Sequence, residues 1–304
     1  MVEPASYSFS RYLQAKTTVD ERARNQTVVD SFQELLADMD APIRVCEIGT
    51  GTGSMIDTVA TWIPTDHSIE YTAIENDPTV LAVAIDRFVD DAEIDPAGLA
   101  EGRCRSVRPS QSMTVEFHHR NGLAYLGTRD REYDVLIAQS FMDLVDVEPA
   151  VGSLLGAVRP GGLAYFPFTF DGTTALLPEI DPELDRRIER RYHHHMDSTV
   201  KAGGYTGDSR AGRHLLCADG PVGHTVEAAG GSDWLVRPVD GAYPADEAYF
   251  LHYILNTIST ALAGDATIET DELQRWTNRR HEQVDAAQLT YLTHQLDVLL
   301  RRSE

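Results

Sequence analysis

Short apolar runs alternate with helical periodicity through the first half of the chain. Continuous apolar segments at 43–48, 68–75 and 133–138 have the length and composition of buried strands. Apolar residues at 78–85 and 147–158 recur at three- and four-residue spacing, which predicts helices. Strands that alternate with helices are typical of parallel sheets, so the pattern predicts a doubly wound α/β fold with helices on both faces of the sheet.

Two further strands and a surface loop complete this half. Residues 113–119 alternate between polar and apolar, as a strand does, and 162–168 form an apolar run after an Arg-Pro-Gly-Gly turn. The polar residues 90–112 are predicted to form a surface loop, and helical spacing at 7–40 predicts a helical cap before the first strand.

Beyond residue 170 the regular alternation breaks. We predict a long Arg-rich helix at 177–200, a glycine-rich lid or mobile loop at 203–212, a sixth strand at 224–238, an amphipathic helix at 245–263 and a closing strand at 289–300. Together, these elements predict a mostly parallel, seven-stranded sheet with an N-terminal helical cap and a helical insertion after the fifth strand.

The first buried strand ends in an acid and runs directly into three alternating glycines. Residues 45–53 read VCEIGTGTG, with Glu47 two positions ahead of Gly49. Glycine is favoured where the backbone takes positive φ and a ligand must approach without a Cβ in the way. A carboxylate at this place suits an ammonium group better than a pyrophosphate.

A second acid, Glu75, stands at the end of the second strand, one crossover later. A carboxylate there can accept hydrogen bonds from both hydroxyls of a ribose.

Together, the acid-x-GxGxG motif and this second acid resemble the class I S-adenosylmethionine-dependent methyltransferase family, over about residues 42–170. The resemblance implies S-adenosyl-L-methionine as cofactor. It implies that Gly49 and Gly51 line the methionine moiety, that Glu47 anchors the amino group, that Glu75 binds the ribose and that Asn76 flanks the adenine. Thr50 and Gly53 belong to the same motif.

Three other positions are assigned to the cofactor by the same resemblance. Asn121 stands where the family often has an acid that accepts the adenine amino proton, and it can supply a carbonyl oxygen instead. Gln139 follows the fourth strand and is expected to wall the methyl-transfer centre. The N-terminal segment 11–25 is expected to cap the cofactor, and its candidate partners for the methionine carboxylate are Tyr12, Lys16, Arg22 and Arg24.

The resemblance also implies an organisation and a reaction. The chain is predicted to be one domain over 1–304, with a cap (1–40), a cofactor-binding core (41–170) and substrate-side elaborations (171–304). The reaction is a direct in-line transfer of the methyl group to a small-molecule acceptor. Asp171 and His195 are the candidate catalytic residues, because an acceptor that loses a proton needs a base near neutrality. Three consecutive histidines on a helix point about 100° apart, so no metal site is expected.

The charge balance restricts the possible partners. Acids outnumber bases 48 to 26, for a net charge of -22, and Lys16 and Lys201 are the only lysines. Such a surface repels nucleic acids and anionic membranes, and it is typical of proteins from extreme halophiles. The three scattered cysteines, the lack of a signal-peptide pattern and the lack of a long apolar run predict a cytoplasmic protein with no membrane partner.

Two other classes remain open. A nicotinamide-dependent (NAD(P)) oxidoreductase uses a similar sheet, but it is typically marked by GxGxxG rather than GxGxG. A non-catalytic module that binds S-adenosylmethionine would share every motif named above.

Overall fold

All strands of the described residues lie in one sheet. The structure is a computed structural model that describes residues 4, 6–89, 103–108, 112–200, 207–218 and 222–304. Within these residues the sheet has nine strands. Eight follow the order β3-β4-β2-β1-β5-β6-β9-β7, and the ninth, β8, pairs with β9. Their bounds are β1 (Ile43–Ile48), β2 (Ile69–Glu75), β3 (Arg103–Arg108), β4 (Met113–His119), β5 (Tyr133–Ile137), β6 (Val158–Leu177), β7 (His224–Gly231), β8 (Trp234–Val236) and β9 (Thr290–Arg302).

The centre of the sheet is parallel. β1 pairs in parallel with both β2 and β5, β2 with β4, and β5 with β6, whereas β3, β7, β8 and β9 run antiparallel to their neighbours. This confirms the predicted doubly wound, mostly parallel fold, with nine strands in place of the predicted seven. The chain order reverses beside β1, and ligands of open α/β sheets bind at the strand ends next to such a reversal.

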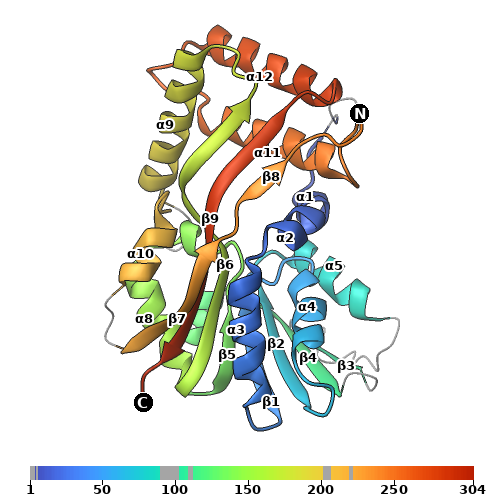
Figure 1. Ribbon diagram of the computed structural model, residues 1–304, viewed down its shortest axis with the longest axis vertical. Helices are drawn as coiled ribbons and strands as arrows, with labels where there is room; N and C mark the ends of the chain where they lie inside the picture. Colours follow the sequence, from blue (N-terminus) through green and yellow to red (C-terminus); the bar gives the residue numbers. More distant parts are fainter. Residues whose placement is uncertain (1–3, 5, 90–102, 109–111, 201–206, 219–221) are drawn as a thin grey trace.

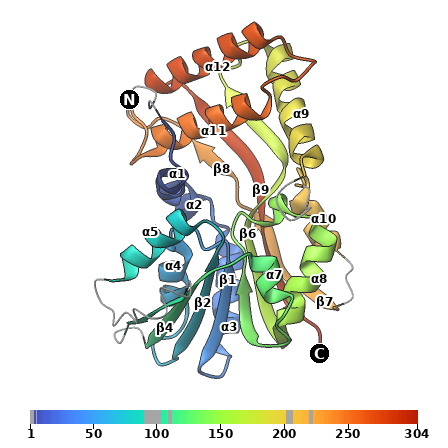
Figure 2. The ribbon, with the colours of Figure 1, turned by 180° about the vertical axis from the view of Figure 1, so that it is seen from behind.

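Helices cover both faces of the sheet (Figures 1 and 2). One face buries the apolar sides of three helices, and the opposite face buries three others. The first group is α3 (Gln26–Ala37), α4 (Ser54–Trp62) and α5 (Pro78–Val89), and the second is α7 (Gly122–Leu126), α8 (Val147–Ala157) and α10 (Ala211–Cys217).

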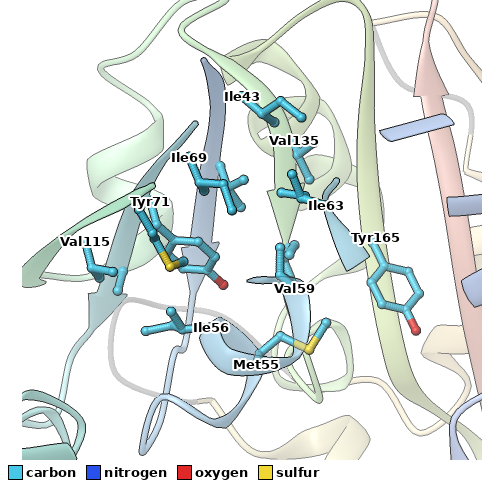
Figure 3. Packing of buried hydrophobic residues seen from close by; sticks show 14 of the residues in the cluster. Ile43, Met55, Ile56, Val59, Ile63, Ile69, Tyr71, Val115, Val135 and Tyr165 are labelled. Atoms are coloured by element: carbon cyan, nitrogen blue, oxygen red, sulfur yellow. The ribbon is translucent and has the colours of Figure 1, made fainter. Parts of the chain in front are cut away.

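The packing of α4 shows how the apolar spacing of the sequence becomes a core. Met55, Ile56 and Val59 recur on one side of the helix and are almost fully buried. They lie on strand residues such as Tyr71 and Val135 (Figure 3). Burial of one such side chain contributes about 1.5–3 kcal/mol, so this contact holds α4, and the turn before it, firmly on the sheet.

β6 and β9 are much longer than the central strands, and their paired ends extend the sheet into a second group of helices (Figure 1). A third apolar cluster surrounds this extension and includes Phe168, Trp234 and Tyr291. The helices that contribute to it are α1 (Phe9–Ala15), α2 (Thr17–Ala23), α9 (Pro182–Ser198), α11 (Glu247–Ala261) and α12 (Thr270–Asp285). No helix in the described ranges is both long and apolar enough to cross a bilayer.

The extension of β6 corrects two predictions. The strand expected at 162–168 runs from Val158 to Leu177, and the helix expected from 177 begins at Pro182. Irregularities in the pairing with β9, between Phe166 and Thr169 and again between Phe170 and Thr173, let the strand continue through residues that resemble turns in the sequence.

The other predicted strands and loops agree only in part with the structure. The closing strand is confirmed as β9, whereas the predicted sixth strand is two strands, β7 and β8. The predicted loop at 90–112 contains β3, a polar strand at the sheet edge, and its residues 90–102 and 109–111 lie outside the described residues. Of the glycine-rich segment 203–212, residues 203–206 lie outside them too, and the end of the segment enters α10.

A buried carboxylate, Asp297 of β9, joins three parts of the chain. It accepts hydrogen bonds from the Asn25 amide at 2.9 Å, the Tyr165 hydroxyl at 3.0 Å and the Phe168 amide at 3.0 Å. Burial raises the pKa of Asp297, and these hydrogen bonds oppose the shift. Phe168 has a φ of +56°, which is unfavourable for a side chain with a Cβ, so the hydrogen bond to its amide helps to hold that backbone in place.

Replacing Asp297 with alanine is expected to lower the free energy of unfolding by about 3 kcal/mol, because three donors lose a buried acceptor. Urea unfolding measures the loss. Glu282→Ala is the control, since that carboxylate is exposed and pairs with Arg279 of the same helix, α12, and its effect should stay within about 0.5 kcal/mol. Equal stabilities of the two variants would contradict the role given to Asp297.

Candidate functional site

The glycine turn after β1 takes the backbone conformation that its sequence requires. Gly49, Gly51 and Gly53 have φ values of +66°, +58° and +78°. A Cβ on Gly49 would lie 3.3 Å from the Phe141 ring, and one on Gly51 would lie 3.3 Å from Leu13. Side chains here would therefore be strained and would enter the space beside the turn. Gly53 caps the start of α4 and does not line the pocket described below, so its part is in the turn.

Glu47 is buried at the end of β1, with 1% of its surface exposed. Its Oε2 accepts hydrogen bonds from Thr50 Oγ1 at 2.5 Å and from the Tyr71 hydroxyl at 2.9 Å. Burial raises the pKa of this carboxyl to about 7, the two hydrogen bonds oppose the shift, and the charge of Glu75 adds to it. A cation bound beside Glu47 would restore the ionised form.

Glu75, at the end of β2, binds the glycine turn directly. Its Oε2 accepts from the Gly51 amide at 3.0 Å, and its Oε1 accepts from the amides of Asn76 and Asp77 at 2.7 and 2.9 Å. The two acids predicted from separate motifs therefore belong to one site.

That site is a pocket of about 320 Å³ at the carboxyl ends of β1, β2 and β5. Most of the predicted cofactor residues line it: Glu47, Gly49, Thr50, Gly51, Glu75, Asn76, Asn121 and Gln139.

Asn121 lies beside α7 and caps that helix. Its Oδ1 accepts from the Ala124 amide at 2.9 Å, so the carbonyl oxygen expected to face a ligand already has one partner. The next residue, Gly122, packs closely on β1, since a Cβ there would lie 2.8 Å from the Ile48 Cβ. Asn121 thus serves the local structure and the pocket wall together.

The candidate cations of the N-terminal segment differ in where they lie. Arg24 does not line the pocket; its guanidinium lies over the Trp62 and Phe168 rings, 5.2 and 5.6 Å from their centroids. Lys16, where α1 meets α2, lines the pocket instead and is 5% exposed. The sequence marked Lys16 by its place in the cap segment and by the scarcity of lysine in the chain.

Lys16 belongs to a small buried polar group. Its Nζ donates to Asp20 Oδ2 at 2.8 Å and to Ser140 Oγ at 3.3 Å. Gln139 Nε2 donates to the same Asp20 oxygen at 3.1 Å, whereas Gln139 Oε1 has no hydrogen-bond partner among the described residues. Burial raises the pKa of Asp20, and the Lys16 charge opposes that shift.

The two predicted catalytic residues, Asp171 and His195, do not line this pocket. Asp171 is a buried residue of β6 that accepts hydrogen bonds from Arg213 Nε at 2.8 Å and Nη2 at 3.0 Å. His195 lies near the end of α9. The prediction for Asp171 depended on a corner after the fifth strand, but β6 continues through that residue, and the His195 prediction depended only on the chemistry of imidazole.

A second cavity, of about 330 Å³, adjoins the first, and its existence was not predicted. The two cavities share Phe9, Leu13, Lys16, Ser140 and Leu144 as lining residues. Its other walls come mainly from α1, β6, α9, β8, α11 and β9. These walls are rich in aromatic side chains: Tyr12, Phe168, Phe170, Tyr192, Trp234, Tyr253 and Tyr291.

Comparisons with known proteins find solved structures that are similar to this chain, but no match by sequence. No family model and no curated protein matches the chain. Similar solved structures include the YcgJ protein from Bacillus subtilis, at 11% identity, covering 92% of this chain and 99% of that one, with a TM-score of 0.47.

Two other similar structures are described as enzymes of different activities. One is a SAM-dependent methyltransferase from Thiobacillus denitrificans in complex with S-adenosyl-L-homocysteine, at 16% identity, covering 99% of this chain and 100% of that one, with a TM-score of 0.42. The other is the [4+2]-cyclase SpnF, at 16% identity, covering 100% and 99% of the two chains, with a TM-score of 0.43. The function is therefore inferred from the geometry of the pocket itself.

The raised pKa of Glu47 predicts how stability depends on pH. Between its ordinary pKa of 4.5 and its folded value of about 7, the unfolded chain releases this proton and the folded chain keeps it, so stability falls as pH rises through that window. Glu47→Gln cannot ionise and should lose about 3 kcal/mol less between pH 4.5 and pH 8 than the unmodified protein.

Urea unfolding of the ligand-free protein at those two pH values measures this difference. Glu70→Gln is the matched control, because Glu70 is an exposed acid on β2, and it should keep the pH dependence of the unmodified protein. Identical pH dependence of Glu47→Gln and the unmodified protein would show that Glu47 ionises normally.

Proposed function

We propose that this protein is an S-adenosylmethionine-dependent methyltransferase that acts on a small-molecule acceptor by direct in-line transfer. The observation that carries the proposal is the meeting of Glu47 and Glu75 in one pocket, where the glycine turn that follows Glu47 donates a hydrogen bond to Glu75 from the Gly51 amide. A carboxylate suited to an ammonium and another suited to a ribose lie at the ends of neighbouring strands, as two parts of one amino-acid-bearing nucleoside require.

The residues present fit that cofactor. Glu47 would bind its ammonium group, and the Gln139 Oε1, which lacks a partner in the described part of the chain, is a second acceptor for it. Glu75 would hold the ribose hydroxyls, while Asn76 and Asn121 would lie at the adenine end. The cradle formed by Gly49 and Gly51 leaves room that a Cβ would fill.

The bound cofactor would supply a methyl group already activated by a positive sulfur, so the protein's main tasks are alignment and exclusion of water. The turn at Gly49 and Gly51 and the Phe141 ring limit how the donor can lie. Leu13 of α1 covers the pocket beside Gly51, and Lys16 lies at the boundary with the second cavity. The adjoining second cavity gives an acceptor a place from which to approach the methyl group.

The pocket's charges disfavour an oxidoreductase. A dinucleotide places its pyrophosphate at the glycine turn, where amide groups must remain free for it. Here the Gly51 amide donates to Glu75, and Glu47 lies behind the same turn, so a pyrophosphate would meet two carboxylates. A module that only binds the cofactor would have no use for the second cavity.

A small acceptor agrees with two further observations. The second cavity, at about 330 Å³, is near the lower end of the range of ligand pockets. The net charge of -22 disfavours a nucleic acid or an anionic membrane as acceptor.

Binding of S-adenosylhomocysteine, measured by calorimetry, tests the function. Glu75→Ala is expected to weaken binding about thirtyfold or more, because charged hydrogen bonds to the ribose are lost. Glu70→Ala, an exposed acid on the same strand, should bind like the unmodified protein. Binding of NAD in place of S-adenosylhomocysteine, or full affinity in Glu75→Ala, would refute the proposal.

A further inference from the structure

The second cavity has an unusual combination of walls: aromatic rings on most sides and one ammonium group at its junction with the first cavity. Among the described lining residues, Lys16 and Asp143 are the charged ones. The negative charge of Asp143 affects the Tyr192 hydroxyl. Burial, together with this charge, raises the pKa of Tyr192 to about 12. Lys16 is the charge at the boundary with the first cavity.

The Lys16 ammonium faces the rings of the second cavity. Its Nζ lies 5.2 Å from the centroid of the Trp234 ring and 5.9 Å from that of the Phe168 ring, and both rings line that cavity. An ammonium has three N–H donors, and the hydrogen bonds to Asp20 and Ser140 use two of them. One donor remains for a ligand atom placed between the two cavities.

A cation at this place selects among acceptor atoms. A developing oxyanion beside Lys16 is stabilised, because opposite charges attract strongly where water is excluded. An amine acceptor becomes positive as it takes the methyl group, so the same Lys16 charge would oppose its reaction. Aromatic walls in turn favour a flat, apolar body and offer little to a charged or sugar-like one.

We propose that the second cavity binds the methyl acceptor and that this acceptor is a small aromatic ring compound with an acidic hydroxyl, a phenol or an enol, whose oxygen lies at Lys16 Nζ. The proposal rests on the proposed function and names its substrate class. Asp20 is a positioning residue, because it holds Lys16 at the boundary through the 2.8 Å ion pair.

The chemical step balances with no further reactant. The acceptor hydroxyl gives its proton to solvent water as it binds beside the ammonium. An oxygen lone pair then forms the O–CH3 bond, the S–CH3 bond breaks, and its electron pair stays on sulfur. The negative oxygen and the positive sulfur cancel, which leaves a neutral methyl ether and a neutral thioether.

The experiment uses the full chain saturated with S-adenosylhomocysteine and the probe 2-naphthol, whose absorption spectrum reports its ionisation. In the unmodified protein the pKa of bound 2-naphthol should fall by at least one unit. Lys16→Met should abolish this shift and leave affinity for S-adenosylhomocysteine within about threefold. Arg11→Met is the matched control on α1, since Arg11 pairs with Asp246 and lines neither cavity, and it should keep the shift.

Methyl transfer from labelled S-adenosylmethionine adds a second readout. Transfer to 2-naphthol should exceed transfer to 2-naphthylamine at least tenfold, and Lys16→Met should reduce it about thirtyfold at pH 7. That loss should shrink as pH passes the pKa of free 2-naphthol, because the ring then ionises unaided. A merely structural defect would persist at every pH.

A variant that does not touch Lys16 keeps the proposal testable should Lys16→Met fold poorly. Ile254→Trp, on α11, fills the second cavity and should abolish 2-naphthol binding while S-adenosylhomocysteine still binds.

Three results would overturn the proposal and leave the proposed function intact: S-adenosylhomocysteine binds but 2-naphthol does not, the amine is the better acceptor, or Lys16→Met loses affinity for S-adenosylhomocysteine itself. Failure of the unmodified protein to bind S-adenosylhomocysteine would refute the proposed function instead.

Discussion

The 3.0 Å hydrogen bond from the Gly51 amide to Glu75 joins the two strand ends on which the site depends. It is possible because β1 and β2 pair in parallel, with Ile48 opposite Ile74, so that both strands end at the same edge. The glycines let the chain turn sharply enough for an amide to face the neighbouring acid. Parallel pairing brings the two acids to one edge, and this contact fixes the turn after Glu47 against Glu75, so that both acids line one pocket.

A second constraint shapes the acceptor side. β6 and β9 extend the sheet past the ends of the central strands. Asp297 of β9 accepts hydrogen bonds from the amide of Asn25, in the N-terminal helical segment, and from the amide of Phe168, in the irregular part of β6. The extension brings aromatic residues of β6, β8 and β9 over the carboxyl ends of the central strands. The second cavity thus results from these long strands, and β6 includes residues that resemble turns in the sequence.

The electrostatics of the site also follow from burial. The protein as a whole carries a net charge of -22, yet the boundary of the two cavities holds a lysine with its charge directed at aromatic rings. Burial disfavours the ionised forms of Glu47 and Asp20. Lys16 stabilises the charge of Asp20, and the ammonium group of a ligand would do the same for Glu47. Local charge, more than net charge, decides which molecules the site can accept. The net negative charge disfavours a nucleic acid or an anionic membrane as acceptor, and it is a basis for predicting a halophilic setting.

The sequence alone determined the parallel sheet and the grouping of the glycine turn with Glu47 and Glu75. These signals are local: a strand, a turn and a helix follow each other within a few residues, and parallel pairing places consecutive strand ends together. Only the tertiary structure decided that Lys16 rather than Arg24 reaches the pocket, that Asp171 and His195 stay outside it, and that a second, aromatic cavity adjoins it. The physical reason is that these outcomes depend on how helices and strands distant in the chain cross and pack. Hydrophobic spacing shows which face of a helix is buried, but not the partner against which it is buried.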